Sequence, residues 1–245
     1  MFSVNYILMV NNNRVVWTYW AGGPMSSARA EAYEYIINKH PTCDVKLVSE
    51  ETFKQYQIES SPIPKEFYLL SSTQQSDYVR SYLMQHYGGV YSDIKPYDFD
   101  FAAILTLLYE DENCWGIGYS YRERELKSLK TYHNINDFKN GDRYIGGGCF
   151  AYKSNTDFTK KWLEVNNLML KNNSIKLLKQ PGTYHPRAIP RGIFRQDSSD
   201  LNVYPTGYPF GWGSFIGNYQ LAQKEYLDHF KPILARVDFP PEQYR

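Results

Sequence analysis

Short runs of β-branched and aromatic residues alternate with helical segments along the first hundred residues of the chain. Each run has the length and composition of a buried strand, and the segments between them have helical start and stop signals. Strands joined through helices are typical of parallel sheets with crossover connections, so the pattern predicts an α/β fold. We expect strands over residues 14–20, 44–48 and 90–93, and helices over 26–39, from residue 49, and over 73–87.

The remaining residues predict two more strands and three more helices around two long irregular stretches. Residues 120–143 are polar, and residues 180–213 are rich in Pro, Gly, Arg and Tyr, which is typical of functional loops. The length of 245 residues suits one domain spanning 1–245. We expect strands over 114–119 and 144–152, and helices over 101–109, 157–170 and 215–230.

Composition excludes several classes of protein. The net charge of +1 argues against a nucleic-acid-binding protein, which usually carries a strong basic excess. Three widely spaced cysteines without a C-x-x-C pair favour buried thiols in a reducing compartment. The apolar run at residues 6–10 is too short to span a membrane and lacks the features of a signal peptide, so it predicts a strand or strand-like arm. We therefore expect a cytoplasmic protein without a membrane span.

The most informative motif joins the helix over 73–87 to the strand that follows it. Asp77 and Arg80 are three residues apart, so they share one helix face. The helix ends at Gly88-Gly89, and the strand then delivers Asp93. A carboxylate accepts from vicinal hydroxyls, and a guanidinium matches phosphate oxygens, which predicts a phosphorylated, hydroxyl-rich ligand. The alternative is a surface ion pair worth at most about 0.5 kcal/mol.

These residues resemble the signature of the DXD-type sugar transferases. Residues 75–80 resemble S-D-x-x-R, residues 88–93 resemble G-G-x-Y-x-D-x-D, and residues 16–23 resemble the first-strand motif I-x-x-x-W-x-G-G. The superfamily includes fungal initiating α-mannosyltransferases, bacterial capsule enzymes and clostridial glucosylating toxins. The resemblance implies a single-domain GT-A fold, a Rossmann-like mixed α/β sheet flanked by helices. It also implies a glycosyltransferase that moves a hexose from a UDP- or GDP-sugar to a glycan hydroxyl with retention of configuration.

The resemblance also implies which residues bind the donor. Trp20 corresponds to an aromatic residue that stacks on the donor base, a contact worth about 1–3 kcal/mol, although it could instead be a core residue. Trp212 lies in a segment that resembles a loop covering the diphosphate, with core packing as its alternative. The donor-binding candidates are Trp20, Ala21, Asp77, Arg80, Tyr91, Ser92, Asp93 and Trp212.

The DXD motif itself is incomplete, and two registers remain open. Without a gap, Asp93 is the first Asp and Lys95 replaces the second; with a two-residue deletion, Asp93 is the second Asp. On the second register Asp93 binds Mn²⁺ or Mg²⁺ directly, and His185 or Asp197 could complete the metal shell. On the first, Lys95 could supply the positive charge without a metal. Either way, Asp93, Arg80 and Lys95 are the catalytic candidates.

Two further features bear on the site. Residues 98–100 read D-x-D literally, but they precede an apolar helix, so helix N-capping is the better interpretation. Relatives usually carry a sugar-contacting Asn where this chain has Gly148, which leaves the donor sugar open.

The incomplete motif also motivates a rival function, a catalytically inactive relative that binds a nucleotide or glycan. A third hypothesis, an effector that glycosylates proteins, rests only on the resemblance to the toxins.

Overall fold

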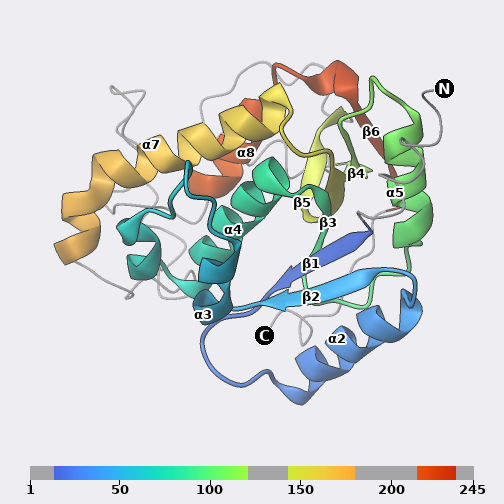
Figure 1. Cartoon of the computed structure of the whole chain (residues 1–245), viewed down its shortest axis with the longest axis horizontal. Coiled ribbons are helices and arrows are strands. Elements are labelled where there is room, and N and C mark those ends of the chain that lie inside the picture. The colour runs from blue at the N-terminus through green and yellow to red at the C-terminus, as the bar shows by residue number, and fades with distance from the viewer. Residues whose placement is uncertain (1–13, 121–142, 180–213, 236–245) are drawn as a thin grey trace, which may run out of the picture.

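A six-stranded sheet forms the centre of the protein in the computed structural model, which describes residues 14–120, 143–179 and 214–235 (Figure 1). The strand order is β2-β1-β3-β5-β4-β6. Strand β5 runs antiparallel to both of its neighbours, whereas the other neighbouring pairs are parallel. The strands are β1 (Val15–Tyr19), β2 (Asp44–Val48), β3 (Gly89–Ser92), β4 (Gly116–Ser120), β5 (Ile145–Tyr152) and β6 (Phe230–Leu234).

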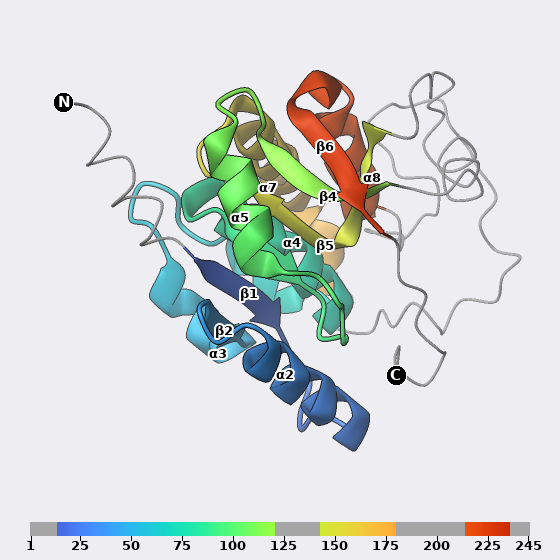
Figure 2. The same cartoon turned by 90° about the vertical axis from the view of Figure 1, so that its right-hand side faces the viewer.

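Helices cover both faces of this sheet, and neighbouring residues of each strand point to opposite faces. Trp17 belongs to the hydrophobic cluster that contains residues of α4, α7 and α8, whereas Val16 belongs to the cluster that contains residues of α2 and α5. Figure 2 shows the sheet between these two helical layers. The helices are α2 (Ser27–Lys39), α3 (Glu50–Phe53), α4 (Ser72–His86), α5 (Phe101–Glu110), α7 (Asp157–Lys179) and α8 (Ser214–Gln223). The mixed sheet flanked by helices is a Rossmann-like α/β arrangement, which confirms the predicted fold class.

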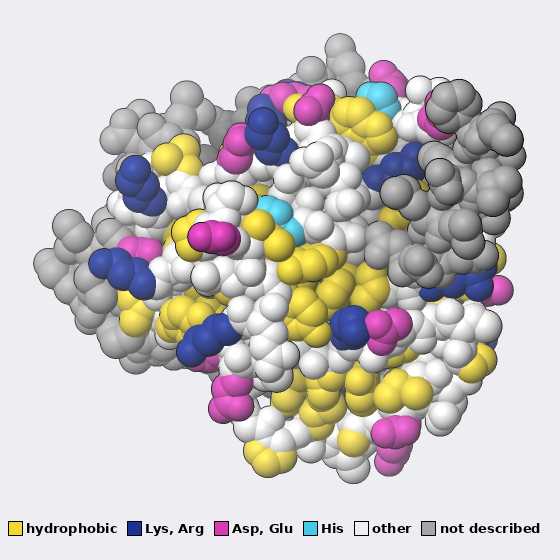
Figure 3. Space-filling view, viewed as in Figure 1, with side chains coloured by type: hydrophobic (Ala, Val, Ile, Leu, Met, Phe, Trp, Pro, Cys, Tyr) yellow, Lys and Arg dark blue, Asp and Glu magenta, His cyan; other side chains and the backbone are white. Residues whose placement is uncertain are grey.

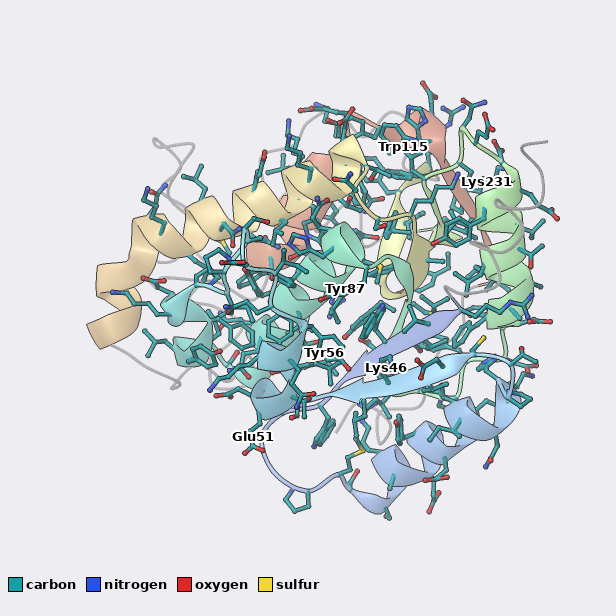
Figure 4. All side chains as sticks on the ribbon, viewed as in Figure 1. Lys46, Glu51, Tyr56, Tyr87, Trp115 and Lys231 are labelled. Atoms are coloured by element: carbon teal, nitrogen blue, oxygen red, sulfur yellow. The ribbon has the colours of Figure 1, made fainter. Side chains whose placement is uncertain are left out.

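The last part of the chain differs from its prediction. The single helix expected over 215–230 is wrong, because α8 ends at Gln223 and β6 begins at Phe230. The ring of Trp115 stacks on His229 at 3.7 Å, and Lys231 forms an ion pair with Asp111 at 2.6 Å (Figure 4). These contacts fix β6 beside β4, so long-range pairing overrides the local helical pattern.

The other predicted elements are present, with small shifts at their ends. Helix α7 continues to Lys179, beyond the predicted end at residue 170. The parallel pairing expected from the first strands and helices is confirmed for β2, β1 and β3, and antiparallel β5 makes the whole sheet mixed, as the resemblance implied. The expected N-terminal strand at 6–10 and most of the two predicted loops lie outside the described residues.

Helix α4 and strand β3 are joined by a glycine turn, which positions the side chains of α4 relative to the end of β3. Ser71 and Gln74 form a capping box that starts the helix. Gly88 and Gly89 have φ angles of +66° and +96°, which end the helix and turn the chain into β3. The indole of Trp17 donates to the Gly88 carbonyl at 2.8 Å.

The aromatic rings of Tyr56 and Tyr87 lie beside this turn (Figure 4). Their centroids are 5.9 Å apart, and both rings also contact Trp17. The Tyr87 hydroxyl donates to the Tyr56 carbonyl at 2.8 Å. The turn between α4 and β3 is therefore held against β1 by packing and hydrogen bonds together.

Gly89→Ala should strongly destabilise the protein, because a β-carbon there would lie 2.7 Å from the Val15 carbonyl oxygen. Left-handed backbone strain costs about 1–2 kcal/mol, and overpacking adds about 1–3 kcal/mol. Gly23→Ala is the matched control, since Gly23 has a φ of +101° and nothing within 4 Å of the added carbon. Urea unfolding measures both changes in the free energy of unfolding. Equal losses would contradict the assignment of a packing role to Gly89.

Charge and apolar character can be followed on the face shown in Figure 3 and along the described helices. Acidic and basic side chains are intermixed on the face shown in Figure 3. Among the helices that the structure describes, none combines the length and the apolar character needed to cross a bilayer.

Candidate functional site

The candidate site lies at one edge of the sheet, where the carboxyl ends of β1 and β3 meet the first half of β5. In parallel α/β sheets, ligands bind outside the carboxyl ends of the strands, where the connections diverge. Strand β1 pairs with β2 on one side and with β3 on the other, which creates such a point. Because β5 is antiparallel to β3, with Ser92 opposite Cys149, its early glycines lie at the same edge.

Asp77 and Arg80 form a buried ion pair near the carboxyl ends of β1 and β3. Their side chains are 10% and 12% exposed, and Asp77 Oδ1 lies 2.8 Å from Arg80 Nη2. The guanidinium lies over the Tyr91 ring, 4.8 Å from its centroid, and donates to the Gly147 carbonyl. Both partners are largely buried, so the pair is not the exposed helix-surface pair that the sequence left as an alternative.

Asp93 and Lys95 form a second ion pair next to the first. Lys95 Nζ donates to Asp93 Oδ2 at 2.8 Å, and Arg80 Nη2 lies 3.9 Å from Asp93 Oδ1. The Asp93 side chain is 27% exposed and that of Lys95 is 11% exposed. The Asp93 backbone N–H donates to the Gly148 carbonyl at 2.7 Å, which joins the end of β3 to β5. Arg29 of α2 donates to the carbonyl of Ile94.

The two carboxylates have opposite pKa shifts. Burial raises the pKa of Asp77 to about 6, although the Arg80 guanidinium opposes this rise. Burial also favours a higher pKa for Asp93, but Lys95 and Arg80 together hold it below its ordinary value. Burial favours a lower pKa for Arg80, but Tyr91, Asp77 and Asp93 raise it overall. Both carboxylates are therefore predominantly ionised at neutral pH, between two cationic side chains.

Trp20 follows β1 at the same edge of the sheet. Its backbone N–H donates to the Val48 carbonyl at 2.9 Å, and its indole donates to the Gly23 carbonyl at 2.7 Å. Trp20 and Ala21 are both partly exposed, so Trp20 is not a core residue. The structure therefore leaves part of the Trp20 ring accessible to a ligand.

Tyr91 and Ser92 are buried beneath the site. The Tyr91 hydroxyl hydrogen-bonds to Ser76 Oγ at 2.8 Å, and its ring supports the Arg80 guanidinium. The Ser92 hydroxyl donates to the Asp93 carbonyl at 2.9 Å. Tyr91 and Ser92 are 1% and 0% exposed, so the geometry gives them a positioning role for Arg80 and Asp93.

Two tyrosines that the sequence did not single out lie beside Gly148. A β-carbon on Gly148 would lie 2.9 Å from the Tyr97 hydroxyl, 3.0 Å from the Tyr119 hydroxyl and 3.2 Å from Asp93 Oδ2. The Gly148 N–H also donates to the Tyr119 hydroxyl at 3.0 Å. An Asn side chain at this position would have to displace the two tyrosine hydroxyls. The glycine in place of the expected Asn was the available sequence signal.

The carboxylate that the sequence assigns to a metal ion already faces two cationic side chains. Mg²⁺ is usually bound by one or two carboxylates together with substrate phosphates, and the Asp93 carboxylate that would serve here already faces Lys95 and Arg80. Within residues 14–120, 143–179 and 214–235, no three His, Cys, Asp or Glu side chains are grouped so as to hold a metal ion. His185, Asp197 and Trp212 lie outside the described residues.

The literal D-x-D at 98–100 has a structural explanation. Asp100 caps α5, since its carboxylate accepts from the Ala103 N–H at 3.0 Å. Asp98 forms an exposed ion pair with Lys39 of α2. The N-capping interpretation of this segment is confirmed.

Comparison with known proteins gives one family. The model of the capsular polysaccharide synthesis protein family matches residues 2–140. The match contains the first strand, the ion pair on α4 and the Asp93–Lys95 segment, but not β5. No curated protein matches the chain.

Proposed function

The chain belongs to the capsular polysaccharide synthesis protein family, and from this premise we propose that it is a glycosyltransferase of the GT-A type. It transfers a hexose from a UDP- or GDP-sugar to a carbohydrate hydroxyl, on a free or lipid-linked glycan. The observation that carries this proposal is the pair of adjoining ion pairs, Asp77–Arg80 and Asp93–Lys95, at the carboxyl edge of the sheet.

The cationic and the acidic side chains of this cluster suit different parts of a nucleotide-diphosphate sugar. Arg80 and Lys95 carry the donors and the charge that phosphate oxygens need. Asp77 and Asp93 are acceptors for the ribose and sugar hydroxyls. Trp20 offers a partly exposed ring for the base.

The sugar is proposed to lie beside Gly148, between Asp93 and two tyrosine hydroxyls. Tyr97 and Tyr119 take the place of the amide that relatives carry there. A hydroxyl both donates and accepts a hydrogen bond, so these two residues can distinguish sugars by the orientation of their hydroxyls. We expect them to influence which hexose the protein accepts.

The proposed reaction breaks the bond between the anomeric carbon and the diphosphate, and forms a bond from that carbon to the acceptor oxygen. The acceptor proton passes to the departing phosphate, as in front-face attack with retention. Arg80 and Lys95 stabilise the negative charge that develops on the leaving diphosphate, a type of electrostatic stabilisation worth about 10²–10³ in rate for one well-placed donor. Asp77 and Asp93 hold these cations and the donor in place.

A divalent cation would supply Lewis-acid stabilisation of the same leaving group, and the sequence leads one to expect Mn²⁺ or Mg²⁺ at Asp93. Because Lys95 and Arg80 already face the Asp93 carboxylate, every step above is assigned to side chains of the chain itself.

The alternative function is an inactive relative that binds a nucleotide or a glycan. Lys95 at the position of the second Asp and Gly148 at the position of the Asn favour this alternative. Incubation with a panel of UDP- and GDP-hexoses distinguishes the two, because an active enzyme releases UDP or GDP by transfer or slow hydrolysis. Binding of nucleotide without release from any member of the panel would support the inactive relative.

Trp20→Ala should weaken the binding of the preferred nucleotide by about 1–3 kcal/mol, because it removes the stacking surface for the base. Trp20→Phe is the matched control, since it retains an aromatic face and should bind more tightly than the alanine variant. Calorimetric titration with UDP and with GDP measures both dissociation constants. An unchanged dissociation constant in Trp20→Ala would remove Trp20 from the donor site.

A further inference from the structure

The Asp93–Lys95 pair is a built-in part of the site rather than an exposed contact. Lys95 is 11% exposed, and its ammonium lies 2.8 Å from Asp93 Oδ2. The backbone at this point is fixed on both sides, because Asp93 donates to Gly148 and Arg29 donates to Ile94. A long lysine side chain is therefore held with its charge next to the carboxylate that a metal would need.

The charges of the cluster already suit an anionic ligand. Asp77 and Asp93 carry the negative charges, while Arg80, Lys95 and the nearby Arg29 are cationic. A divalent cation at Asp93 would add two positive charges within a few ångströms of Lys95, and like charges repel strongly in a partly buried site. A bound diphosphate instead neutralises the excess positive charge of the cluster.

The space around Asp93 also argues against a divalent cation at its carboxylate. Lys95 occupies one side of Oδ2, and the Gly148 backbone with the hydroxyls of Tyr97 and Tyr119 lies on another. The other oxygen, Oδ1, faces Arg80 Nη2 at 3.9 Å. Both carboxylate oxygens of Asp93 thus face a cationic donor.

We infer that Lys95 replaces the divalent cation of the donor site, so that the diphosphate of a nucleotide sugar binds and leaves without a metal. An ammonium has three N–H donors, so Lys95 can keep its bond to Asp93 and also bind phosphate oxygens. Arg80, with five donors in a planar fork, adds a second cation next to it. This inference rests on the proposed function, since it needs a nucleotide-diphosphate donor.

The test is calorimetric titration of UDP and of GDP in EDTA and in Mn²⁺. Wild-type protein should bind the preferred nucleotide equally well in both conditions. Lys95→Ala should weaken binding in EDTA by at least about tenfold, because a charged hydrogen-bonding partner of the phosphate is lost. Lys46→Ala is the matched control: Lys46 also pairs with an aspartate two residues before it, Asp44, at 2.7 Å, but on edge strand β2 (Figure 4). This control should bind like the wild type.

A second variant separates the effect from a folding failure. Lys95→Asp places a second carboxylate two residues after Asp93, and this variant should bind the nucleotide only when Mn²⁺ is present. Such a gain of metal dependence requires a folded site.

Wild-type binding that needs Mn²⁺, or unchanged binding by Lys95→Ala in EDTA, would overturn the inference and leave the proposed function intact. Failure of the wild type to bind either nucleotide in either condition would contradict the proposed function itself.

Discussion

Asp93→Ala should lower sugar transfer by at least about 100-fold, measured as kcat/KM with the donor that the wild type uses. Asp93 positions Lys95 through the 2.8 Å ion pair and lies close to Arg80. Its loss removes an acceptor for the donor hydroxyls and frees the cation that binds the leaving group, and effects of this kind typically cost 10²–10³ in rate.

Asp98→Ala is the control for this prediction. Asp98 belongs to the literal D-x-D of the sequence, but it lies on the surface in an ion pair with Lys39. An exposed pair contributes about 0–1 kcal/mol, so this variant should retain both stability and activity. If Asp98→Ala lost activity and Asp93→Ala kept it, the donor site would lie at residues 98–100 instead.

Arg80→Met should abolish activity and also destabilise the fold by about 3–5 kcal/mol at neutral pH. The cause is Asp77, which is 10% exposed and would be left as an unpaired buried charge. The double variant Arg80→Met with Asp77→Asn removes both charges and should be more stable than Arg80→Met alone. Urea unfolding of the three proteins measures these differences, and a double variant that is no more stable would refute the explanation.

The pH dependence of Arg80→Met gives an independent check. Burial already raises the pKa of Asp77 from 3.8 to about 6, and loss of the guanidinium raises it further. Between the unfolded and folded pKa values the native state binds a proton that the unfolded state does not, so stability rises as pH falls. The deficit of Arg80→Met relative to the wild type should therefore shrink between pH 8 and pH 5. A deficit that stays constant would show that Asp77 does not cause it.

The local half of the site could be predicted from the sequence because it depends on spacing within one helix and the turn after it. Asp77 and Arg80 share a face through the i,i+3 rule, and the Gly88-Gly89 turn necessarily brings Asp93 close to them. Their burial could not be predicted, because it depends on β5, whose backbone accepts from Arg80 at Gly147.

The contacts that come from distant residues were missed for the same reason. Tyr97 and Tyr119 lie beside Gly148 only because β3, β4 and β5 are neighbours in the sheet, and no local period encodes that order. The closing strand is a similar case. No strand was predicted at β6, and its pairing with β4, which places Phe230 opposite Gly116, determines the conformation.

Among the described residues, the alternation of strands and helices was sufficient to predict the surrounding helices and the parallel pairing of β2, β1 and β3, whereas the mixed sheet was implied only by the family resemblance. Local patterns specify the type of an element, whereas its neighbours in the sheet are decided by packing. The antiparallel strand β5 is the example that matters most for the site, because it brings Gly147 and Gly148 beside Arg80 and Asp93.

The most direct measurement is a crystal structure of the protein with UDP or GDP, whichever binds, grown in EDTA. We expect the base against Trp20, and the diphosphate within hydrogen-bonding distance of Arg80 and Lys95. A nucleotide bound away from the carboxyl ends of β1 and β3 would contradict this assignment of the donor site.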